Sequence, residues 1–317
     1  MKVLVTGGAG FIGSHLADGL LKEGHEVVIL DDLSTGHVDH LNPAARFYQM
    51  DIQSPWLDEL FKIERPEAVL HEAAQASVRR SVEDPGFDAS INVMGTVTLL
   101  QASVRHGVRR FLFASTGGAI YGDTDLVPTP EDAPAIPMSP YGASKLAAEV
   151  YLRTFHALHG LSYAALRYAN VYGPRQDPHG EAGVVAIFAQ RLLSGETARI
   201  NGDGKQTRDF VYVGDVAEAN ARALTSDAVG SFNVGTGVET DINAIFQVLK
   251  RLSSNNQTEV HGPAMPGEQR RSVVDARKLE KVMGWRPQTS LEAGLSATVR
   301  YFRQASTARA AAPARLA

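Results

Sequence analysis

The stretch VLVTGGAGFIGSHLADGLL, from Val3 to Leu21, decides the fold of this chain. It opens with a short apolar run of the kind that a buried strand makes. It closes with a segment in which the apolar residues Ile12, Leu16 and Leu20 recur every four positions and so form one face of a helix. A strand that enters a helix through a glycine turn is the first unit of a parallel α/β sheet.

The glycine turn predicts a dinucleotide site. The residues from Gly8 to Gly13 have the spacing G-x-G-x-x-G, and Gly7 precedes them. Where Cβ atoms are absent, the backbone turns tightly and approaches a pyrophosphate, which rests on the free N–H groups of the helix N-terminus. The residues that we expect at the dinucleotide are Gly7, Gly10, Phe11, Ile12 and Gly13.

Two acids after the second expected strand indicate which dinucleotide binds. Asp31 lies eighteen residues after Gly13, where an acid accepts hydrogen bonds from the adenosine ribose hydroxyls. Asp32 follows it, no arginine adjoins the pair, and a carboxylate repels the 2′-phosphate of NADP. We therefore predict that NAD is the cofactor. The alternative interpretation is a glycine-rich turn followed by a capping acid.

Strand-like and helix-like segments alternate through the first half of the chain, which predicts right-handed βαβ crossovers and a doubly wound parallel sheet. The expected strands are residues 2–6, 26–30, 46–50, 68–71, 109–115 and 163–166, and the expected helices are residues 12–23, 55–63, 87–106 and 140–159. After about Asn170 the pattern loosens into loops that contain glycine and proline. We expect a NAD-binding domain over residues 1–170, to which later segments return. A smaller substrate lobe over 171–305 and a flexible tail over 306–317 are expected to follow.

Composition and charge exclude several classes of protein. The net charge of -4 offers no basic surface to nucleic acid or anionic lipid. The chain has no cysteine, which excludes disulfides and thiolate chemistry and favours a cytoplasmic location. The ten histidines are scattered without metal-ligand spacing, so we expect no metal. The first residues run directly into the glycine turn and no apolar run approaches about 18 residues, so we expect neither a signal peptide nor a membrane span.

A tyrosine and a lysine four residues apart indicate acid–base chemistry. In SPYGASKLAAEVYL, Tyr141 and Lys145 lie near the start of an expected helix and therefore on one of its faces. A nearby ammonium favours a phenolate, so we expect Lys145 to lower the pKa of the Tyr141 phenol from its usual value of about 10. Such a tyrosine removes a hydroxyl proton while a nicotinamide takes the hydride from the same carbon. The structural alternative is an ordinary residue pair on a helix surface.

Seven segments, met in order along the chain, carry a resemblance to a known family. They are TGGAGFIGSH, LDDLSTG, HEAAQASVRRSVEDP, STGGAIYG, SPYGASK, RYANVYGPRQ and RDFVYVGDVA. With them the chain resembles the extended short-chain dehydrogenases/reductases over roughly residues 1–305, and among these the NAD-dependent nucleotide-sugar epimerase/dehydratase family. It is most similar to the UDP-glucose 4-epimerase branch. The resemblance implies a Rossmann-type sheet with a smaller C-terminal substrate-binding lobe, and 4-epimerisation of a UDP-hexose through a 4-keto intermediate.

The same resemblance assigns further residues to the site. Beyond the glycine turn, Asp31 and Asp32, the residues that it places at the cofactor are Asp51, Ile52, Ala73, Ala74, Tyr141, Lys145 and Tyr168. The residues that it places around the nucleotide diphosphate of the substrate are Asn170, Val184, Arg208 and Glu268. It also implies a homodimer, formed by a four-helix contact of the helices expected at 87–106 and 140–159.

Arg208 suits a diphosphate by its own chemistry as well, because one guanidinium binds two oxygens at once. The structural alternative is that Arg208 pairs with Asp203 or Asp209.

The segment FLFASTGGAIYG ends an expected strand in two hydroxyls. The family has a catalytic Ser or Thr before a Tyr-Gly pair, with three residues between them, and that spacing, counted back from Tyr121, falls on Gly117. Counting forward along the strand gives Thr116 instead, and the register of a strand fixes direction more firmly than loop length does. We therefore expect Thr116 to bond the substrate alcohol, with Ser115 as the second candidate.

Two glycines, Gly117 and Gly118, follow these hydroxyls. Relatives that eliminate water carry an Asp-Glu pair directly after the Thr, as acid and base. Glycine cannot transfer a proton, so the resemblance favours epimerisation over dehydration. The other interpretations are a nucleotide-sugar reductase that consumes NADH and a non-catalytic NAD-binding regulator.

The substrate lobe holds two further features. Counting four residues on from Glu268 gives Ser272, where a large tyrosine in relatives restricts the sugar pocket and a small residue admits an N-acetyl group. The alternative is that Ser272 begins the strand SVVD and points elsewhere. An arginine common before the acid loop in relatives is absent here, and Arg270 or Arg271 is its candidate replacement.

Overall fold

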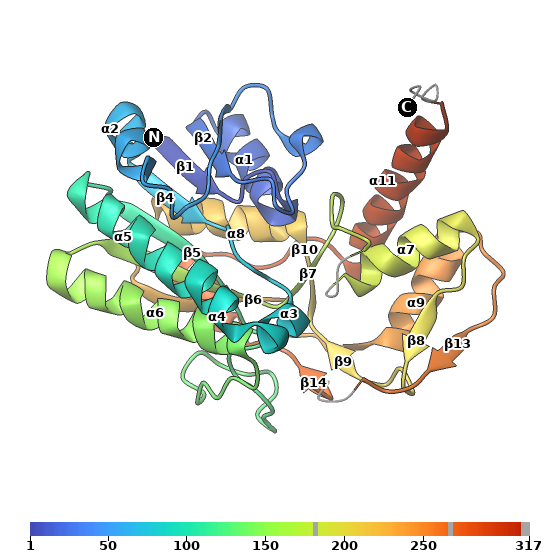
Figure 1. Cartoon of the computed structure of the whole chain (residues 1–317). Coiled ribbons are helices and arrows are strands. Elements are labelled where there is room, and N and C mark those ends of the chain that lie inside the picture. Colours follow the sequence, from blue (N-terminus) through green and yellow to red (C-terminus); the bar gives the residue numbers. More distant parts are fainter. Residues whose placement is uncertain (180–182, 266–268, 312–317) are drawn as a thin grey trace.

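The computed structural model describes residues 1–179, 183–265 and 269–311. Its main feature is a seven-stranded sheet, parallel throughout, with the order β11-β6-β5-β4-β1-β2-β3 (Figure 1). The strands are β1 (Lys2–Thr6), β2 (Glu26–Asp31), β3 (Arg46–Gln49), β4 (Ala68–His71), β5 (Arg110–Thr116), β6 (Ser162–Tyr168) and β11 (Gly230–Val234). The strand order reverses at β1, which confirms the doubly wound α/β sheet predicted from the alternating segments.

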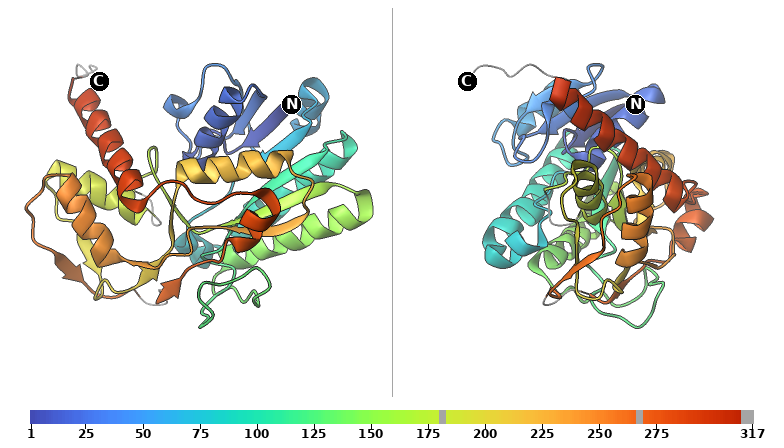
Figure 2. Two further views of the ribbon diagram at one scale, coloured as in Figure 1. Left: turned by 180° about the vertical axis from the view of Figure 1, so that it is seen from behind. Right: turned by 90° about the vertical axis from the view of Figure 1, so that its right-hand side faces the viewer.

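Helices cover both faces of the sheet because its strands bury side chains on both sides. In β1, Val3 and Val5 join one hydrophobic cluster and Leu4 joins the other. The helices on the first face are α1 (Phe11–Lys22), α8 (Val213–Thr225) and α10 (Arg277–Met283). Those on the second face are α2 (Leu57–Glu64), α5 (Gly95–Arg105) and α6 (Pro140–His159). Seen from behind, α8 lies across the sheet (Figure 2).

The single helix expected over residues 87–106 is divided into shorter helical segments. It consists of α4 (Pro85–Ala89), a π-helical segment (Ser90–Met94) and α5, and α3 (Val78–Glu83) precedes it. The start lies two residues earlier than predicted, because the Asp84 side chain accepts a hydrogen bond from the Phe87 N–H at 2.9 Å and Pro85 occupies the first turn.

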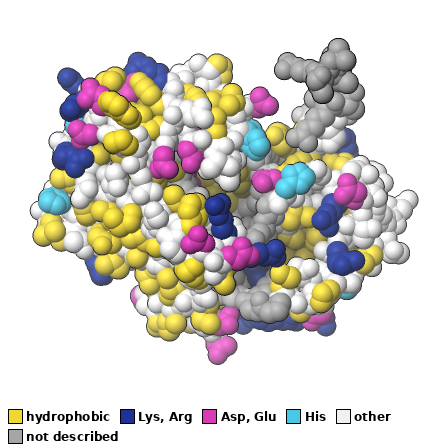
Figure 3. Space-filling view, in the orientation of Figure 1, with side chains coloured by type: hydrophobic (Ala, Val, Ile, Leu, Met, Phe, Trp, Pro, Cys, Tyr) yellow, Lys and Arg dark blue, Asp and Glu magenta, His cyan; other side chains and the backbone are white. Residues whose placement is uncertain are grey.

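The smaller lobe has its own core, formed by α7 (Val184–Ser194), α9 (Ile242–Leu252) and α11 (Leu291–Ala311). Short strands outside the seven-stranded sheet pair with one another in small separate sheets. They are β7 (Asn170–Tyr172), β8 (Arg199–Asn201), β9 (Thr207–Arg208), β10 (Phe210–Tyr212), β12 (Thr240–Asp241), β13 (Val260–Gly262) and β14 (Arg271–Ser272). Between the sheet and this lobe the molecular surface is hollowed, and charged side chains gather there (Figure 3).

Two features of the second half bear on how the chain divides into domains. The chain returns to the large sheet through α8, β11 and α10, and Trp285 is fully buried in the first core cluster. The helix α11 continues to Ala311, so the first residues of the expected flexible tail are helical. Among the described residues, no helix combines the length and the apolar character that crossing a bilayer requires.

Candidate functional site

The glycine turn joins β1 to α1 at the carboxyl edge of the sheet. Gly7 has a φ of +68°, and a Cβ added there would lie 2.6 Å from the Ala73 nitrogen. A Cβ on Gly13 would lie 2.2 Å from the Gly7 carbonyl oxygen. The helix begins after Gly10 with no side-chain cap, so the N–H groups of its first turn remain available to an anion. The turn is therefore a cradle that side chains would fill.

Asp31 organises the loop that faces this turn. Its carboxylate accepts hydrogen bonds from the Ala9 N–H at 2.9 Å and from the Leu33 N–H at 2.8 Å. Burial raises the pKa of the Asp31 carboxyl, and these two N–H groups partly oppose that shift. A Cβ on Gly36 would lie 2.8 Å from the Asp31 carboxylate, so this glycine keeps space open beside it. The buried carboxylate thus anchors the phosphate turn through the Ala9 N–H.

The other cofactor residues predicted from the sequence lie along the same edge. Ala73 lies against Gly7, as its short contact with the glycine backbone shows, and Ala74 is half-buried beside it in the chain. Ile52 is buried, whereas Asp51 and Asp32 are exposed. The Asp32 carboxylate accepts hydrogen bonds from the backbone N–H and the hydroxyl of Ser34.

Tyr141 and Lys145 lie on one face of α6 as predicted, with the Lys145 Nζ 5.9 Å from the centre of the Tyr141 ring. The helix is fixed at its start by Ser139, whose hydroxyl accepts a hydrogen bond from the Gly142 N–H at 3.2 Å. The ammonium of Lys145 is buried and donates to the Ala114 carbonyl of β5 at 2.9 Å. The pair is thereby held at the carboxyl end of β5.

The electrostatics of the pair differ from the expectation. Burial raises the pKa of the Tyr141 phenol, and the Asp88 and Glu72 carboxylates raise it further. The prediction that Lys145 brings this pKa below its usual value is therefore wrong. Burial lowers the pKa of Lys145 to about 8, against the opposing effect of Glu72 and Asp88. The sequence pattern showed the spacing of the pair and not the carboxylates that approach it from other elements.

The structure separates the two hydroxyls at the end of β5. The Ser115 hydroxyl is buried and donates to the Glu149 carboxylate at 2.6 Å. Thr116 follows it in the strand and therefore points to the opposite face. Its Oγ1 lies 3.9 Å from the position of a Cβ on Gly118, and the Ser272 hydroxyl lies 3.8 Å from that position. Thr116 and Ser272 therefore flank the same glycine.

The substrate residues predicted from the sequence come from three segments. Asn170 opens β7, Val184 opens α7, and Arg208 of β9 pairs in register with Ser272 of β14. In a parallel pair, residues in register point to the same face. Glu268 lies outside the described residues.

The acids considered as alternative partners of Arg208 bind other groups. The Asp203 carboxylate accepts two hydrogen bonds from Arg270, at 2.8 and 2.9 Å. The buried Asp209 carboxylate accepts hydrogen bonds from the Thr236 N–H and hydroxyl and from the Gly237 N–H. Arg271 lies against Glu239.

Sequence reasoning missed a buried ion pair below the site. The Arg167 guanidinium donates to both oxygens of Glu149, at 2.9 and 2.7 Å, and the Ser231 hydroxyl also donates to Glu149. Arg167 donates further to the Tyr121 hydroxyl at 2.9 Å. Two signals of this ion pair were available in the sequence. They are the charged Arg167 inside the apolar strand YAALRY and the acid Glu149, four positions after Lys145.

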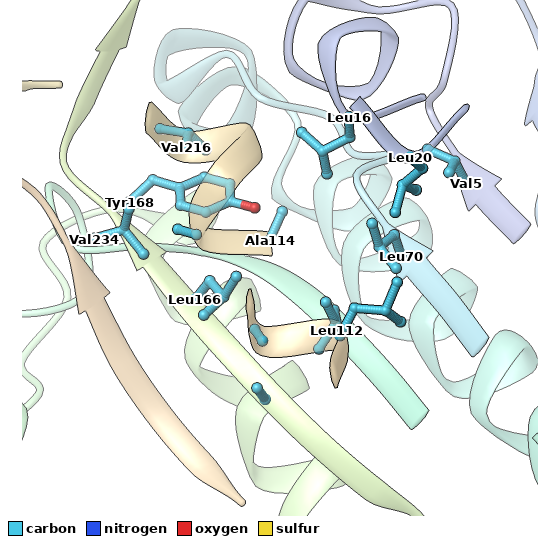
Figure 4. Packing of buried hydrophobic residues seen from close by; sticks show 14 of the residues in the cluster. Val5, Leu16, Leu20, Leu70, Leu112, Ala114, Leu166, Tyr168, Val216 and Val234 are labelled. Carbon is cyan, nitrogen blue, oxygen red and sulfur yellow. The ribbon is translucent and has the colours of Figure 1, made fainter. Parts of the chain in front are cut away.

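Glu72 was missed as well. It follows β4 directly, and its carboxylate accepts a hydrogen bond from the Tyr168 hydroxyl at 2.9 Å. Tyr168 belongs to the core cluster that also contains Val216 and Ala114 (Figure 4). The signal was an acid placed immediately after a buried strand, at the edge where open parallel sheets bind ligands.

Known proteins are similar to this chain in both sequence and fold. A model of the NAD dependent epimerase/dehydratase family matches residues 3–235. A UDP-glucose 4-epimerase of Mycolicibacterium smegmatis is 48% identical over 313 residues, which cover 96% of this chain and 100% of the relative. The crystal structure of a UDP-glucose 4-epimerase from Thermotoga maritima with UDP-glucose is similar with a TM-score of 0.94 and 48% identity, covering 96% of this chain and 100% of that one. A UDP-glucose 4-epimerase from Thermus thermophilus in complex with NAD has a TM-score of 0.92 and 45% identity, with the same coverage.

The cofactor named in this family description agrees with the NAD that we predicted from the acid after the second strand. The residues present fit that cofactor, because the cradle between Gly7 and Gly13 would be filled by any Cβ and the Asp31 carboxylate lies beside it. Motifs, sheet order and full-length similarity all agree. This chain belongs to the NAD-dependent epimerase/dehydratase family.

Proposed function

We propose that this protein inverts the configuration at C4 of a UDP-hexose and interconverts UDP-glucose and UDP-galactose. The observation that carries the proposal is the position of Tyr141 and Lys145 on one face of α6, with Lys145 bonded to the end of β5. This acid–base pair lies at the same sheet edge as the glycine turn. The similarity to two UDP-glucose 4-epimerase structures over 96% of the chain supports the same reaction.

Each residue has a separate task in this mechanism. Bound NAD supplies an acceptor that takes the C4 hydride and returns it to the other face of the 4-keto sugar. Tyr141 removes the O4 proton as the hydride leaves and gives it back after the sugar has turned. Lys145 provides positive charge beside the phenolate, and Thr116 bonds the O4 oxygen.

The two glycines after Thr116 favour epimerisation over dehydration. Elimination of water needs a second acid and base, and neither Gly117 nor Gly118 carries a titratable group. A Cβ on Gly117 would lie 2.5 Å from a Val274 methyl group. A carboxylate side chain at 117 would therefore need the segment around Val274 to move.

The decisive experiment follows the products. Purified protein incubated with UDP-galactose is expected to yield UDP-glucose, with no net change in nicotinamide absorbance because the cofactor is regenerated in each cycle. The variant Tyr141→Phe is expected to turn over on the order of 10²–10⁴ times more slowly while it still binds NAD. Steady accumulation or consumption of NADH would instead support a reductase, and turnover at the native rate by the variant would contradict the mechanism.

For the substrate, we propose that Arg208, Asn170, Val184 and Glu268 contact the nucleotide diphosphate. Arg208 suits this role because it lies half-buried on β9, in register with Ser272 of β14. A guanidinium binds two phosphate oxygens at once. The N-terminus of α7, at Val184, contributes backbone N–H groups of the kind that bind anions.

We propose further that the sugar pocket admits an N-acetyl group. Ser272 lies near Gly118, on the side where Thr116 lies, and a serine leaves more room there than a tyrosine. The native protein is expected to interconvert UDP-N-acetylglucosamine and its galacto epimer. In Ser272→Tyr this activity is expected to fall selectively, as measured by parallel assays of both sugar pairs. Absence of N-acetylated activity in the native protein, or equal loss of both activities, would contradict the proposal.

The remaining proposals concern assembly and location. We propose that the protein is a homodimer in which α5 and α6 of each subunit form a four-helix contact. Three side chains on α6, Val150, Tyr151 and Leu158, are apolar and exposed, and such groups mark contact surfaces. The cytoplasmic location expected from the lack of cysteine stays a prediction.

A further inference from the structure

Glu149 lies one helical turn after Lys145 on α6, and therefore on the same face. Lys145 donates to the carbonyl of Ala114, and Glu149 accepts a hydrogen bond from the hydroxyl of the next residue, Ser115, at 2.6 Å. Two successive turns of the helix are thus bonded to two successive residues near the end of β5. Thr116 is the last residue of that strand. The helix that carries the acid–base pair and the strand end that carries Thr116 therefore meet at this point.

The Glu149 carboxylate is fully bonded although it is buried. Its Oε1 accepts hydrogen bonds from the Ser115 hydroxyl and from the Arg167 Nε at 2.9 Å. Its Oε2 accepts from the Arg167 Nη2 and from the Ser231 hydroxyl, both at 2.7 Å. Glu149 and Arg167 are each 7% exposed. Ser115 of β5 and Arg167 of β6 are partners in register, and Ser231 belongs to β11, so one carboxylate joins α6 to three neighbouring strands.

Arg167 extends this network into the segment between β5 and α6. Its Nη1 donates to the Tyr121 hydroxyl at 2.9 Å and to the Glu131 carbonyl at 3.2 Å. The Tyr121 hydroxyl donates in turn to the Asn233 Oδ1 at 2.8 Å, and the Asn233 Nδ2 donates to the Asp275 carbonyl at 3.1 Å. Asp275 lies in the segment that follows β14. A chain of hydrogen bonds therefore runs from the acid–base helix to the substrate side of the proposed site.

A buried ion pair contributes direction more than stability. Removing two charges from water costs about as much free energy as their attraction returns, so an apolar pair of similar volume often gives a fold of equal stability. Apolar groups form no directed bonds, whereas a guanidinium holds a carboxylate through two parallel hydrogen bonds. The Ser144 hydroxyl, in the first turns of α6, donates to Asp88 at 2.6 Å and so joins α6 to α4 and not to the sheet. The ion pair is thus a directed link between α6 and the sheet, one turn beyond Lys145.

We propose that Glu149 and Arg167 are positioning residues that set the placement of the Tyr141–Lys145 pair against the end of β5. They act through the helix and the strands that they join, and not by contact with the reacting atoms. The ion pair provides most of the restraint, because hydrogen bonds between charged groups are about twice as strong as neutral ones, so Ser115→Ala leaves it in place. The inference rests on the proposed role of the acid–base pair in the reaction.

The variant Glu149→Gln keeps the size of the side chain and removes its charge. Misplacement of reacting groups by about 1 Å costs up to about 10²-fold in rate, so kcat for UDP-galactose is expected to fall about 10- to 100-fold while KM changes little. Glu64→Gln is the matched control. Glu64 is also buried and accepts hydrogen bonds from Arg46 and Tyr48, both at 2.6 Å, but it lies at the opposite edge of the sheet, where β3 begins. This control is expected to melt at a lower temperature and to keep the native kcat.

The placement of the helix can be measured without a substrate. Hydrogen exchange of the backbone N–H groups at the start of α6 is followed by mass spectrometry in NAD-loaded protein. The exchange is expected to be faster than native in Glu149→Gln and native in Glu64→Gln. A milder variant, Arg167→Lys, keeps the positive charge but cannot hold both carboxylate oxygens and the Tyr121 hydroxyl at once, so a smaller loss of kcat is expected.

Native kcat in Glu149→Gln, or an equal loss of kcat in Glu64→Gln, would overturn the inference. If Glu149→Gln does not fold, Arg167→Lys decides, and native kcat in that variant would overturn the inference instead. Faster exchange at the start of α6 in Glu149→Gln, when the native protein converts no UDP-sugar, would contradict the proposed function alone.

Discussion

At the scale of single residues, two adjacent hydroxyls at the end of β5 have opposite directions and therefore separate roles. Thr116→Ala is expected to lower kcat by about 10²-fold, through loss of a group that bonds the reacting oxygen, and to leave the melting temperature nearly unchanged. Ser115→Ala is expected to do the reverse, because it removes a buried hydrogen bond to Glu149 that is worth about 1 kcal/mol. Measurements of kcat and of thermal unfolding on both variants decide which hydroxyl bonds the substrate. A larger loss of kcat in Ser115→Ala than in Thr116→Ala would contradict the assignment of Thr116.

The sequence predicted the residues that share one local element and missed those that meet only in space. The four-residue spacing of Tyr141 and Lys145 follows from helix geometry, so it could be predicted without a structure. The approach of Glu72 and Asp88 depends on how β4 and α4 pack against α6, and no local pattern encodes that. This is why the predicted direction of the Tyr141 pKa was wrong.

At the scale of elements, the long periodic segments were predictable and the short ones were not. The expected strand over residues 109–115 is β5 in the structure, shifted by one residue and extended to Thr116. The strand β11 was missed, because its sequence GSFNV has little apolar periodicity and its pairing with β6 supplies the order. The strands β9, β12 and β14 have two residues each, and contacts with the rest of the lobe define them.

The element that positions the cofactor is the turn between β1 and α1, and its glycines can be tested against a control in the same helix. In Gly13→Ala the new methyl group would lie 2.2 Å from the Gly7 oxygen, so the turn must open. A Cβ on Gly19 would meet no neighbouring atom within 4 Å, so Gly19→Ala fits α1 without strain. Calorimetric titration with NAD is expected to show an affinity at least about tenfold weaker for Gly13→Ala and unchanged for Gly19→Ala. Native affinity in Gly13→Ala would contradict this account of the turn.

At the scale of the whole molecule, the sheet and the smaller lobe contribute different parts of one site. In the proposed site, the sheet edge supplies the turn, the acid–base pair and Thr116, while β9 and β14, which pair in register, supply Arg208 and Ser272. The chain crosses between the two parts several times, so the residues of the substrate side are scattered in sequence. Apart from Arg208, their roles could be taken only from family resemblance. On the cofactor side, the glycine turn, Asp31 and the Tyr141–Lys145 pair could be predicted from spacing and residue chemistry, whereas Asp51, Ile52, Ala73, Ala74 and Tyr168 also came from the resemblance.

The proposed dimer is a property of the whole molecule, and we assign its contact surface to the helices α5 and α6. The helices α5 and α6 pack side by side, and hydrophobic side chains gather over this part of the surface (Figure 3). Tyr151 and Leu158 of α6 are exposed by 41% and 70%, and their spacing of seven residues places them on one stripe. If two such stripes pack together, charges placed within them must be buried without partners, which is costly.

The double variant Tyr151→Glu and Leu158→Glu is therefore expected to be monomeric at concentrations where the native protein is a dimer, as measured by light scattering after size-exclusion chromatography. Ile63→Glu is the matched control, because Ile63 is equally apolar and 62% exposed but lies on α2. It is expected to remain dimeric. Since the stripe contains neither Tyr141 nor Lys145, the monomeric variant is expected to keep its NAD binding. A native protein of monomer mass, or a double variant that stays dimeric, would contradict the assignment of this surface.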